Sequence, residues 1–201
     1  MQTLELLIGQ MLFVRLGFFF DITEALFHDG QTVKQCFFFG AFKRFFGMNG
    51  FIDGGQLGRY QRLQPTVNEI FDSSAIARVS LGATWRKLSP VERKQFVQLM
   101  VDTIAATYAD RFVDYTGQQF EVLSELENRP GRWVVKTVLT KADGGKVNLD
   151  YYIKDGRIFN VIADGVSDLS LRRADYAGVI KQNGYVFLLE SLKNKLAAFG
   201  K

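Results

Sequence analysis

The chain has 201 residues, of which 47% are hydrophobic and 23% charged, and its formal net charge at pH 7 is +4. This length suits one domain with a sizeable core, alone or with an appendage, and the composition is ordinary for a soluble globular protein. The basic residues are scattered, which argues against a nucleic-acid-binding protein, and the single cysteine excludes an intramolecular disulfide.

The first 58 residues differ in composition from the rest. They contain 12 of the 19 phenylalanines, the only histidine and the only cysteine. Neither helical nor strand periodicity persists through them. The apolar stretch from Leu6 to Phe20 is interrupted by Gln10 and Arg15, so it is too short to span a bilayer. It also lacks the basic leading segment and cleavage site of a signal peptide.

Three interpretations of residues 1–58 are open. The segment is an extension that binds a membrane or a partner, or it folds against the following domain, or it is an artefact of the assigned start site or reading frame. The third is favoured because the segment lacks an export signal and because the resemblance to a known family, described below, begins sharply at Gly58-Arg59-Tyr60. The domain organisation we expect is therefore a Phe-rich segment at 1–58 and one folded domain at 59–201.

From Arg59 onward the apolar residues recur regularly. Spacings of three and four residues predict an amphipathic helix whose stripe comprises Tyr60, Leu63, Val67, Ile70 and Phe71. Asp72 and Ser73 are suited to cap a short helix that extends to Leu81.

Ser89-Pro90-Val91-Glu92 is a strong helix start signal. Ser89 is placed to accept from the first helical turn, Pro90 suits the first helical position, and Glu92 can reach back to Ser89. Gly117 predicts the end of this helix. Its apolar stripe comprises Phe96, Leu99, Met100, Ile104, Tyr108, Phe112 and Tyr115.

Strands follow this helix. One begins at Phe120, and residues 133–140 form another with apolar residues on both faces. Residues 146–154 alternate between polar and apolar, which predicts a half-buried strand. A hairpin turn at Asp155-Gly156 leads into residues 158–163. Two helices separated by Asn183-Gly184 close the chain.

This order of elements predicts an α+β fold, with helices packed on one face of a twisted antiparallel sheet. The usual catalytic and metal-binding signatures are missing from the sequence: there is no His-Glu-x-x-His, Cys pair, Gly-x-Ser-x-Gly or phosphate-binding loop. His28 and Cys36 are best interpreted as unrelated side chains. Gly54 to Gly58 lacks the lysine and the preceding strand of a phosphate-binding loop.

The order and spacing of several motifs resemble one known family, the lipid carriers of the bacterial Mla pathway (maintenance of lipid asymmetry), also called the toluene-tolerance family. The resemblance covers residues 59–201. Its motifs are Pro65, Phe71-Asp72, Leu81-Gly82, Trp85-Arg86, Ser89 to Arg93, Phe96, Tyr108 to Gly117, Val147 to Tyr151 and Ile162 to Ser167. The stretch Asp164 to Arg173 is similar to the hopanoid-associated branch, HpnM.

The resemblance implies a periplasmic carrier whose sheet and helices enclose an apolar pocket around acyl or polycyclic lipid tails. Its partners would be a phospholipid or hopanoid-type lipid and membrane-bound, ABC-type transporter complexes, with no nucleic acid. It implies neither a cofactor nor a metal, and no enzymatic step. The family's N-terminal helices and export signal are not recognisable here, which is a departure from its pattern.

The expected lining residues combine the inner face of the strands, the long helix and the Gly-Val-Ser match. They are Phe112, Tyr115, Trp133, Val135, Val147, Leu149, Tyr151 and Val166. Periodicity alone does not distinguish such a lining from a filled core. Lys87, Arg172 and Arg173 are the candidate cations for a lipid headgroup, against the ordinary interpretation of exposed surface charges.

Two further interpretations belong to other functional classes. One is a small α+β enzyme with Asp150 or Asp164 as acid or base. For Asp150 a solvated sheet residue, and for Asp164 a turn residue, is the ordinary explanation. The other is an adaptor that binds a partner helix in an apolar groove.

Overall fold

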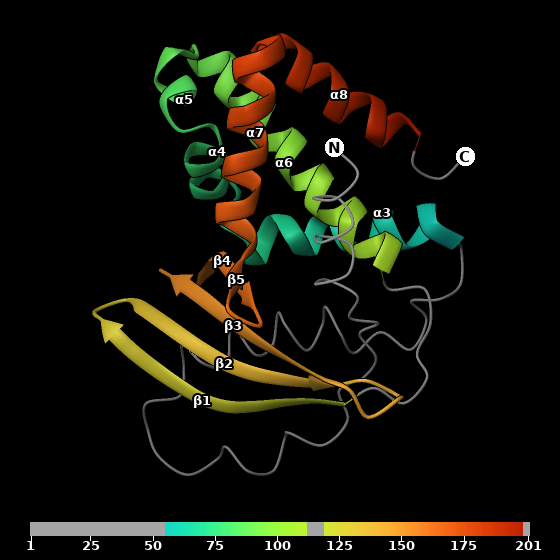
Figure 1. The fold of residues 1–201 in the computed structure, drawn as a ribbon, viewed down its shortest axis with the longest axis vertical. Helices are drawn as coiled ribbons and strands as arrows, with labels where there is room; N and C mark the ends of the chain where they lie inside the picture. Colours follow the sequence, from blue (N-terminus) through green and yellow to red (C-terminus); the bar gives the residue numbers. More distant parts are fainter. Residues whose placement is uncertain (1–54, 112–118, 199–201) are drawn as a thin grey trace.

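The computed structural model describes residues 55–111 and 119–198, which form a layer of helices above an antiparallel sheet (Figure 1). The α+β fold predicted from the sequence is confirmed. The helices are α3 (Gly55–Ile70), α4 (Ser73–Leu81), α5 (Ala83–Lys87), α6 (Pro90–Arg111), α7 (Asp168–Asn183) and α8 (Tyr185–Ala197). The strands are β1 (Gln119–Arg129), β2 (Arg132–Thr140), β3 (Lys146–Lys154), β4 (Arg157–Ala163) and β5 (Val166–Ser167).

The helix starts follow from local hydrogen bonding. Asp72 caps α4 by accepting from the Ala75 N–H at 2.9 Å. The Ser89 N–H and hydroxyl both donate to the Glu92 carboxylate, and the Glu92 N–H donates back to Ser89 Oγ at 3.3 Å. Both caps were predicted. Helix α3 begins at Gly55, four residues before the predicted start of the domain, and continues through Pro65.

The short helix α5 was not predicted. It is held by Arg93, whose guanidinium donates to the carbonyl oxygens of Trp85 and Arg86 and lies 5.4 Å from the centre of the Trp85 ring. These contacts satisfy carbonyl groups at the end of α5, so its conformation depends on a side chain from the next helix.

The five strands pair in sequence order, each antiparallel to the next. Strand β3 has the predicted alternation of buried and exposed residues. The β3–β4 turn has positive φ at Asp155 (50°) and Gly156 (78°), as a two-residue hairpin requires. The edge strand β1 shifts register twice against β2, between Val122 and Ser124 and again near Arg129.

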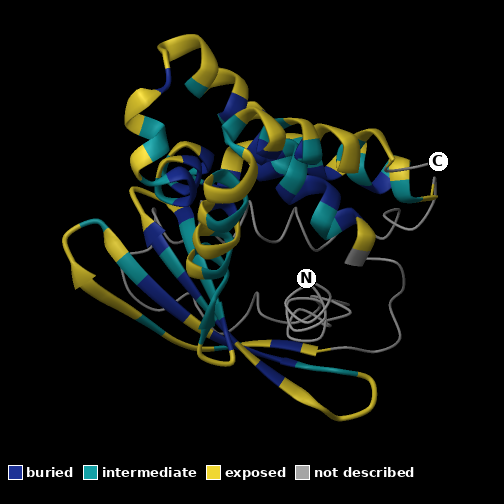
Figure 2. Ribbon diagram, turned by 45° about the horizontal axis from the view of Figure 1, so that its top comes forward, coloured by how far each residue is buried: buried dark blue, intermediate teal, exposed yellow. Residues whose placement is uncertain are grey.

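The core lies between the two layers and among the helices (Figure 2). Phe96 of α6 is fully buried and packs edge-on against Tyr176 of α7, with ring centres 6.2 Å apart, and against Tyr185 of α8 at 6.1 Å. These ring contacts join α6 to α7 and α8, while the main neighbours of α7 are α4 and α8.

Strand β4 is the main attachment of the helices to the sheet in the described part of the chain, because it packs against α3, α4 and α7. The junction between α3 and α4 is also tied to it through the backbone. Phe71 bridges to Ile158, and the Asp72 N–H donates to the Ile158 carbonyl at 2.8 Å. The sheet is therefore anchored to the helices near one edge.

Candidate functional site

One face of β2 and β3 carries four of the predicted lining residues. Val135, Val147, Leu149 and Tyr151 are all buried. In the β2–β3 register Val135 lies opposite Tyr151, and the flanking pairs are Thr137 with Leu149 and Leu139 with Val147. The four side chains therefore share the face that turns toward the helical layer, and their contact with a lipid stays a prediction.

The other predicted lining residues differ in burial and position. Trp133 lies on the same face, opposite Ile153, and is half-buried. Val166 is half-buried in β5 and pairs with Ala163. Phe112 and Tyr115 lie outside the described residues.

Tyr151 connects this face to the helices. Its ring lies 6.4 Å from that of Phe120 on β1. Burial raises the pKa of the Tyr151 hydroxyl well above its ordinary value, and Tyr108 of α6 adds to the increase. Tyr108 in turn packs its ring 5.9 Å from Phe71. Aromatic side chains thus extend from the sheet to the helical layer.

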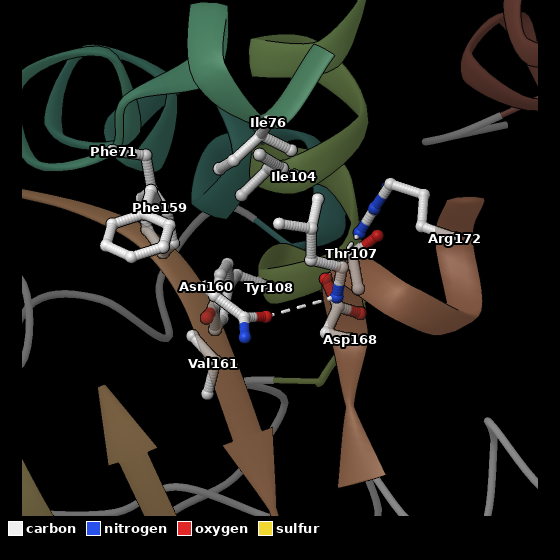
Figure 3. A pocket seen from close by; sticks show the side chains of 11 residues that line it. Phe71, Ile76, Ile104, Thr107, Tyr108, Phe159, Asn160, Val161, Asp168 and Arg172 are labelled. Carbon is white, nitrogen blue, oxygen red and sulfur yellow. Dashed lines mark hydrogen bonds and ion pairs between the residues drawn. The ribbon is translucent and has the colours of Figure 1, made fainter. Parts of the chain in front are cut away.

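A small cavity lies where α4, α6, α7 and β4 meet (Figure 3). Its volume is about 50 Å³. Most of its wall is apolar, and one end carries polar groups. The lining residues are Phe71, Ile76, Ile104, Thr107, Tyr108, Phe159, Asn160, Val161, Asp168, Leu169 and Arg172. Val161 lies opposite Tyr151 in the β3–β4 register, so the cavity adjoins the apolar sheet face.

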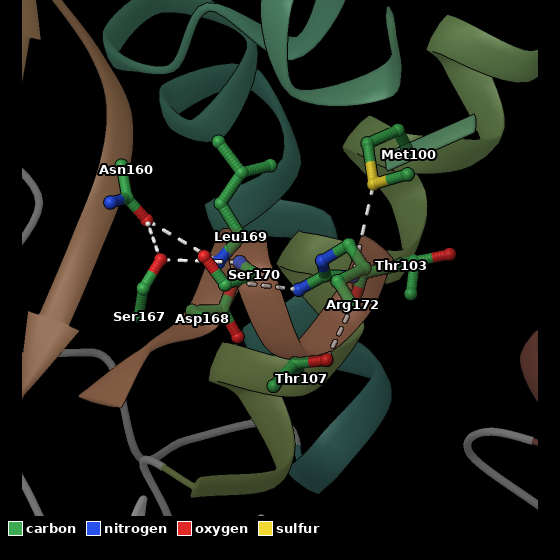
Figure 4. A network of polar contacts seen from close by, with 9 residues as sticks. All are labelled: Met100, Thr103, Thr107, Asn160, Ser167, Asp168, Leu169, Ser170 and Arg172. Atoms are coloured by element: carbon green, nitrogen blue, oxygen red, sulfur yellow. Dashed lines mark hydrogen bonds and ion pairs between the residues drawn. The ribbon is translucent and has the colours of Figure 1, made fainter. Parts of the chain in front are cut away.

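The polar end of the cavity is built around Arg172 (Figure 4). Its Nη2 donates to Asp168 Oδ2 at 3.1 Å, and its Nη1 lies 3.8 Å from the Met100 sulfur. Burial acts to lower the pKa of the guanidinium, but the Asp168 carboxylate and the Tyr176 hydroxyl outweigh that effect and raise it. Arg172 therefore stays charged on the edge of an apolar cavity.

A second polar group fixes the start of α7. Asn160 Oδ1 accepts from the Ser167 hydroxyl at 3.0 Å and from the Leu169 N–H at 3.3 Å, and Ser167 Oγ caps the helix by accepting from the Ser170 N–H. This network positions Asp168 and Arg172 relative to β4.

The other two candidate cations lie on the surface. Arg173 is exposed on α7, and its guanidinium lies beside Gly82. Lys87 is exposed at the end of α5. Neither of them lines the cavity described above. Of the three candidate cations, Arg172 is the one that does.

The two carboxylates that were considered as a catalytic acid or base, Asp150 and Asp164, have structural explanations. Asp164 has a positive φ of 45°, and its carboxylate accepts from the Asn148 N–H at 2.8 Å and from Asn148 Nδ2 at 3.1 Å. It therefore acts as a turn residue. Asp150 is half-buried opposite Lys136 on the sheet face away from the Leu149 side chain. The two aspartates do not line the cavity.

Within the described ranges, no group of three or more His, Cys, Asp or Glu residues is placed to hold a metal ion. The helices of the same ranges are also too short or too polar to cross a bilayer.

Several cavity residues were missed by the sequence analysis, most importantly Asn160, Asp168 and Ile76. Asp168 and Arg172 are four residues apart on a helix, a spacing that brings opposite charges together. That signal was available in the sequence. Nothing in the sequence around Asn160 indicated its role, because the β4–β5 turn brings its partners Ser167 and Leu169 to it.

A family model identifies the family of the chain, and a solved structure shares its fold. The profile of the MlaC protein family matches residues 52–194. Comparison with curated proteins finds no match. A solved structure of a phospholipid-binding protein from Ralstonia solanacearum, in complex with a phospholipid, has a TM-score of 0.69 and 17% sequence identity. The alignment covers 86% of this chain and 100% of that one.

Proposed function

The chain belongs to the MlaC family, and from this premise we propose that it is a periplasmic lipid carrier that shields lipid tails between its sheet and its helices. The observation that carries the proposal is the family match, which includes both layers and the junction between them. The bound phospholipid in the Ralstonia solanacearum protein supports a phospholipid as cargo. The proposed activity needs neither a cofactor nor a chemical step.

The physical demand on such a carrier is large. Each methylene group kept from water is worth about 0.8 kcal/mol, so a sixteen-carbon chain needs shielding worth roughly 12 kcal/mol. A few polar contacts do not supply that free energy, whereas a deep apolar pocket does. The buried face around Leu149 and Tyr151 is the apolar surface that we propose for this role.

The cavity lined by Arg172 is too small to hold a lipid in this conformation. Its volume is about 50 Å³, whereas pockets for small-molecule ligands are about 300–1,000 Å³. We therefore propose that loading separates β1–β3 from the helices, with β4 as the fixed edge. The concentration of helix contacts on β4 supports this opening.

The finer parts of the proposal concern cargo and partners. We propose that the protein carries lipid between inner- and outer-membrane transport complexes, an inner-membrane ABC-type transporter among them. The sequence of Asp164 to Arg173 resembles the hopanoid-associated branch, so a hopanoid-type lipid is the alternative cargo. Lipid extraction from freshly purified protein distinguishes a glycerophospholipid from a triterpenoid by mass.

The test is lipid co-purification of a variant with a blocked cavity. Val161→Trp adds a large side chain beside Tyr151 and the cavity, and we expect it to reduce bound lipid at least severalfold in native mass spectrometry. Overpacking is expected to cost about 1–3 kcal/mol of stability, which a thermal melt checks.

The matched control is Val91→Trp, at a position that is 66% exposed on α6. It adds the same side chain away from the cavity and is expected to keep the wild-type lipid content. A wild-type protein that neither co-purifies with lipid nor takes it up from vesicles would contradict the proposal.

A further inference from the structure

The guanidinium of Arg172 has more hydrogen-bond donors than the protein uses. One N–H of Nη2 donates to the Asp168 carboxylate, Nη1 meets the weakly accepting Met100 sulfur, and the Tyr176 hydroxyl is a further hydrogen-bond partner of the guanidinium. The Nε is buried and has no hydrogen-bond partner in the described part of the chain. A buried donor without a hydrogen-bond partner is costly.

Asp168 is placed so that it can leave this pair. Its side chain is 38% exposed, whereas that of Arg172 is 15% exposed. Rotation of the carboxylate toward water keeps it in the first turn of α7, where a negative charge is favourable. The cation would then remain at the cavity with Nε and the Nη2 donor of the ion pair free.

Asn160 adds a neutral polar group to the cavity wall, on the other side of Asp168 from Arg172 (Figure 4). Its Oδ1 is occupied by Ser167 and Leu169, and this fixes the amide. Beyond these polar groups the wall is apolar, with Ile76, Ile104 and Val161.

A cation with an unpartnered donor, next to a mostly apolar wall, fits the oxyanion of an amphiphile. We propose that Arg172 binds a lipid phosphodiester or a fatty-acid carboxylate, and that this oxyanion takes the place of Asp168. The inference rests on the proposed carrier function and adds to it the class of cargo that the site selects. A planar guanidinium pairs with two oxygens of such a group at once, which the single bond to Asp168 does not provide.

The proposal makes opposite predictions for the two members of the ion pair. Arg172→Met removes the cation with similar length, and we expect retention of oxyanionic lipid to fall by about tenfold, the loss typical of one hydrogen bond to a charged group. Asp168→Asn removes the competing charge, and we expect retention to rise. A purely structural ion pair would make both variants worse.

The experiment uses the full chain after removal of lipid, incubated separately with phosphatidylglycerol vesicles, oleate and diacylglycerol-containing neutral vesicles. Native mass spectrometry then measures the bound fraction. The first two probes distinguish a phosphodiester from a carboxylate, and diacylglycerol has no oxyanion. Arg173→Met is the matched control, because it removes an exposed arginine one residue away and should leave all three bound fractions unchanged.

The outcomes separate this inference from the proposed function. Uptake of none of the three probes by wild type contradicts the carrier itself. Equal uptake of all three, or equal losses in both variants, overturns the oxyanion site while the carrier stands. If Arg172→Met does not fold, Asp168→Asn decides alone: a gain in oxyanionic lipid supports the site, and a loss or no change overturns it.

Discussion

Ser89 and Glu92 close the first turn of α6 by reciprocal hydrogen bonds, at distances of 2.6–3.3 Å between their donor and acceptor atoms. Such a capping box satisfies backbone N–H groups that have no partner within the helix. Ser89→Ala removes the hydroxyl, and we expect a loss of about 1 kcal/mol in the free energy of unfolding. Urea titration followed by circular dichroism measures it.

The control for this variant is Ser74→Ala. Ser74 is an exposed serine inside α4, so its replacement removes a hydroxyl from a helix without removing a cap. Its effect should stay within about 0.5 kcal/mol. A loss of the same size in both variants would show that the capping box of α6 contributes nothing specific.

The same cap gives stability a defined pH dependence. Hydrogen bonds from the Ser89 side chain and backbone lower the pKa of Glu92 below its ordinary value. Because its pKa is lowered in the folded state, ionised Glu92 contributes to the free energy of unfolding above the unfolded pKa, about 4.3. This contribution is lost as the pH falls through the folded pKa. The Glu92→Gln variant should lack this pH dependence, and urea midpoints measured between neutral and acidic pH test the expectation.

Local sequence was sufficient for this cap, because all its groups lie within four consecutive residues. It was not sufficient for Asn160, Ser167 and Arg172. Their positions depend on the β4–β5 turn and on how α7 packs against α6, which brings Met100 to a residue 72 positions away. The contacts of these three residues could therefore not be derived from sequence spacing alone.

At the scale of elements, Phe96 of α6 contacts both C-terminal helices. Phe96 is fully buried between Tyr176 and Tyr185. Phe96→Ala leaves a cavity among three helices, and we expect it to cost about 3–5 kcal/mol. Chemical denaturation of the delipidated protein measures this cost.

Val91→Ala on the same helix is the comparison, because its side chain is 66% exposed. It should change stability by no more than about 0.5 kcal/mol. If the two variants were equally stable, α7 and α8 would not depend on Phe96 for their position.

The elements themselves were largely predictable, because alternation and helical stripes reflect which side of each element is buried. The β3 strand and its hairpin turn are examples. Helix α5 was missed, since its five residues carry no periodic stripe and Arg93 from α6 holds its end. The predicted lining residues on β2 and β3 do share one face, but a shared buried face is equally the pattern of a filled core.

At the scale of the whole molecule, the proposed opening links lipid binding to stability. A ligand that binds the folded state alone stabilises it by about 2.7 kcal/mol at a hundredfold excess over its Kd. We expect the lipid-loaded protein to melt at a higher temperature than the delipidated one. Hydrogen exchange should slow on loading mainly in β2 and β3, while the amides of β4 change little.

Exchange that slows equally in every strand would contradict β4 as a fixed edge. A melting temperature independent of added lipid, at concentrations where native mass spectrometry detects binding, would contradict the link between lipid binding and stability. The cavity variant Val161→Trp provides the comparison, because its melting temperature should respond less to lipid than that of the wild type.

The irregular pairing of β1 has a consequence for the behaviour of the protein in a crowded compartment. Among the described residues β1 is the outermost strand of the sheet, and such a strand offers backbone groups to any similar strand that meets it. Two register shifts in β1, near Val122 and Arg129, interrupt the even spacing of those groups. A second chain therefore cannot form a continuous ladder of hydrogen bonds along the whole strand. The exposed leucines at 123 and 126 are then less able to nucleate fibril formation.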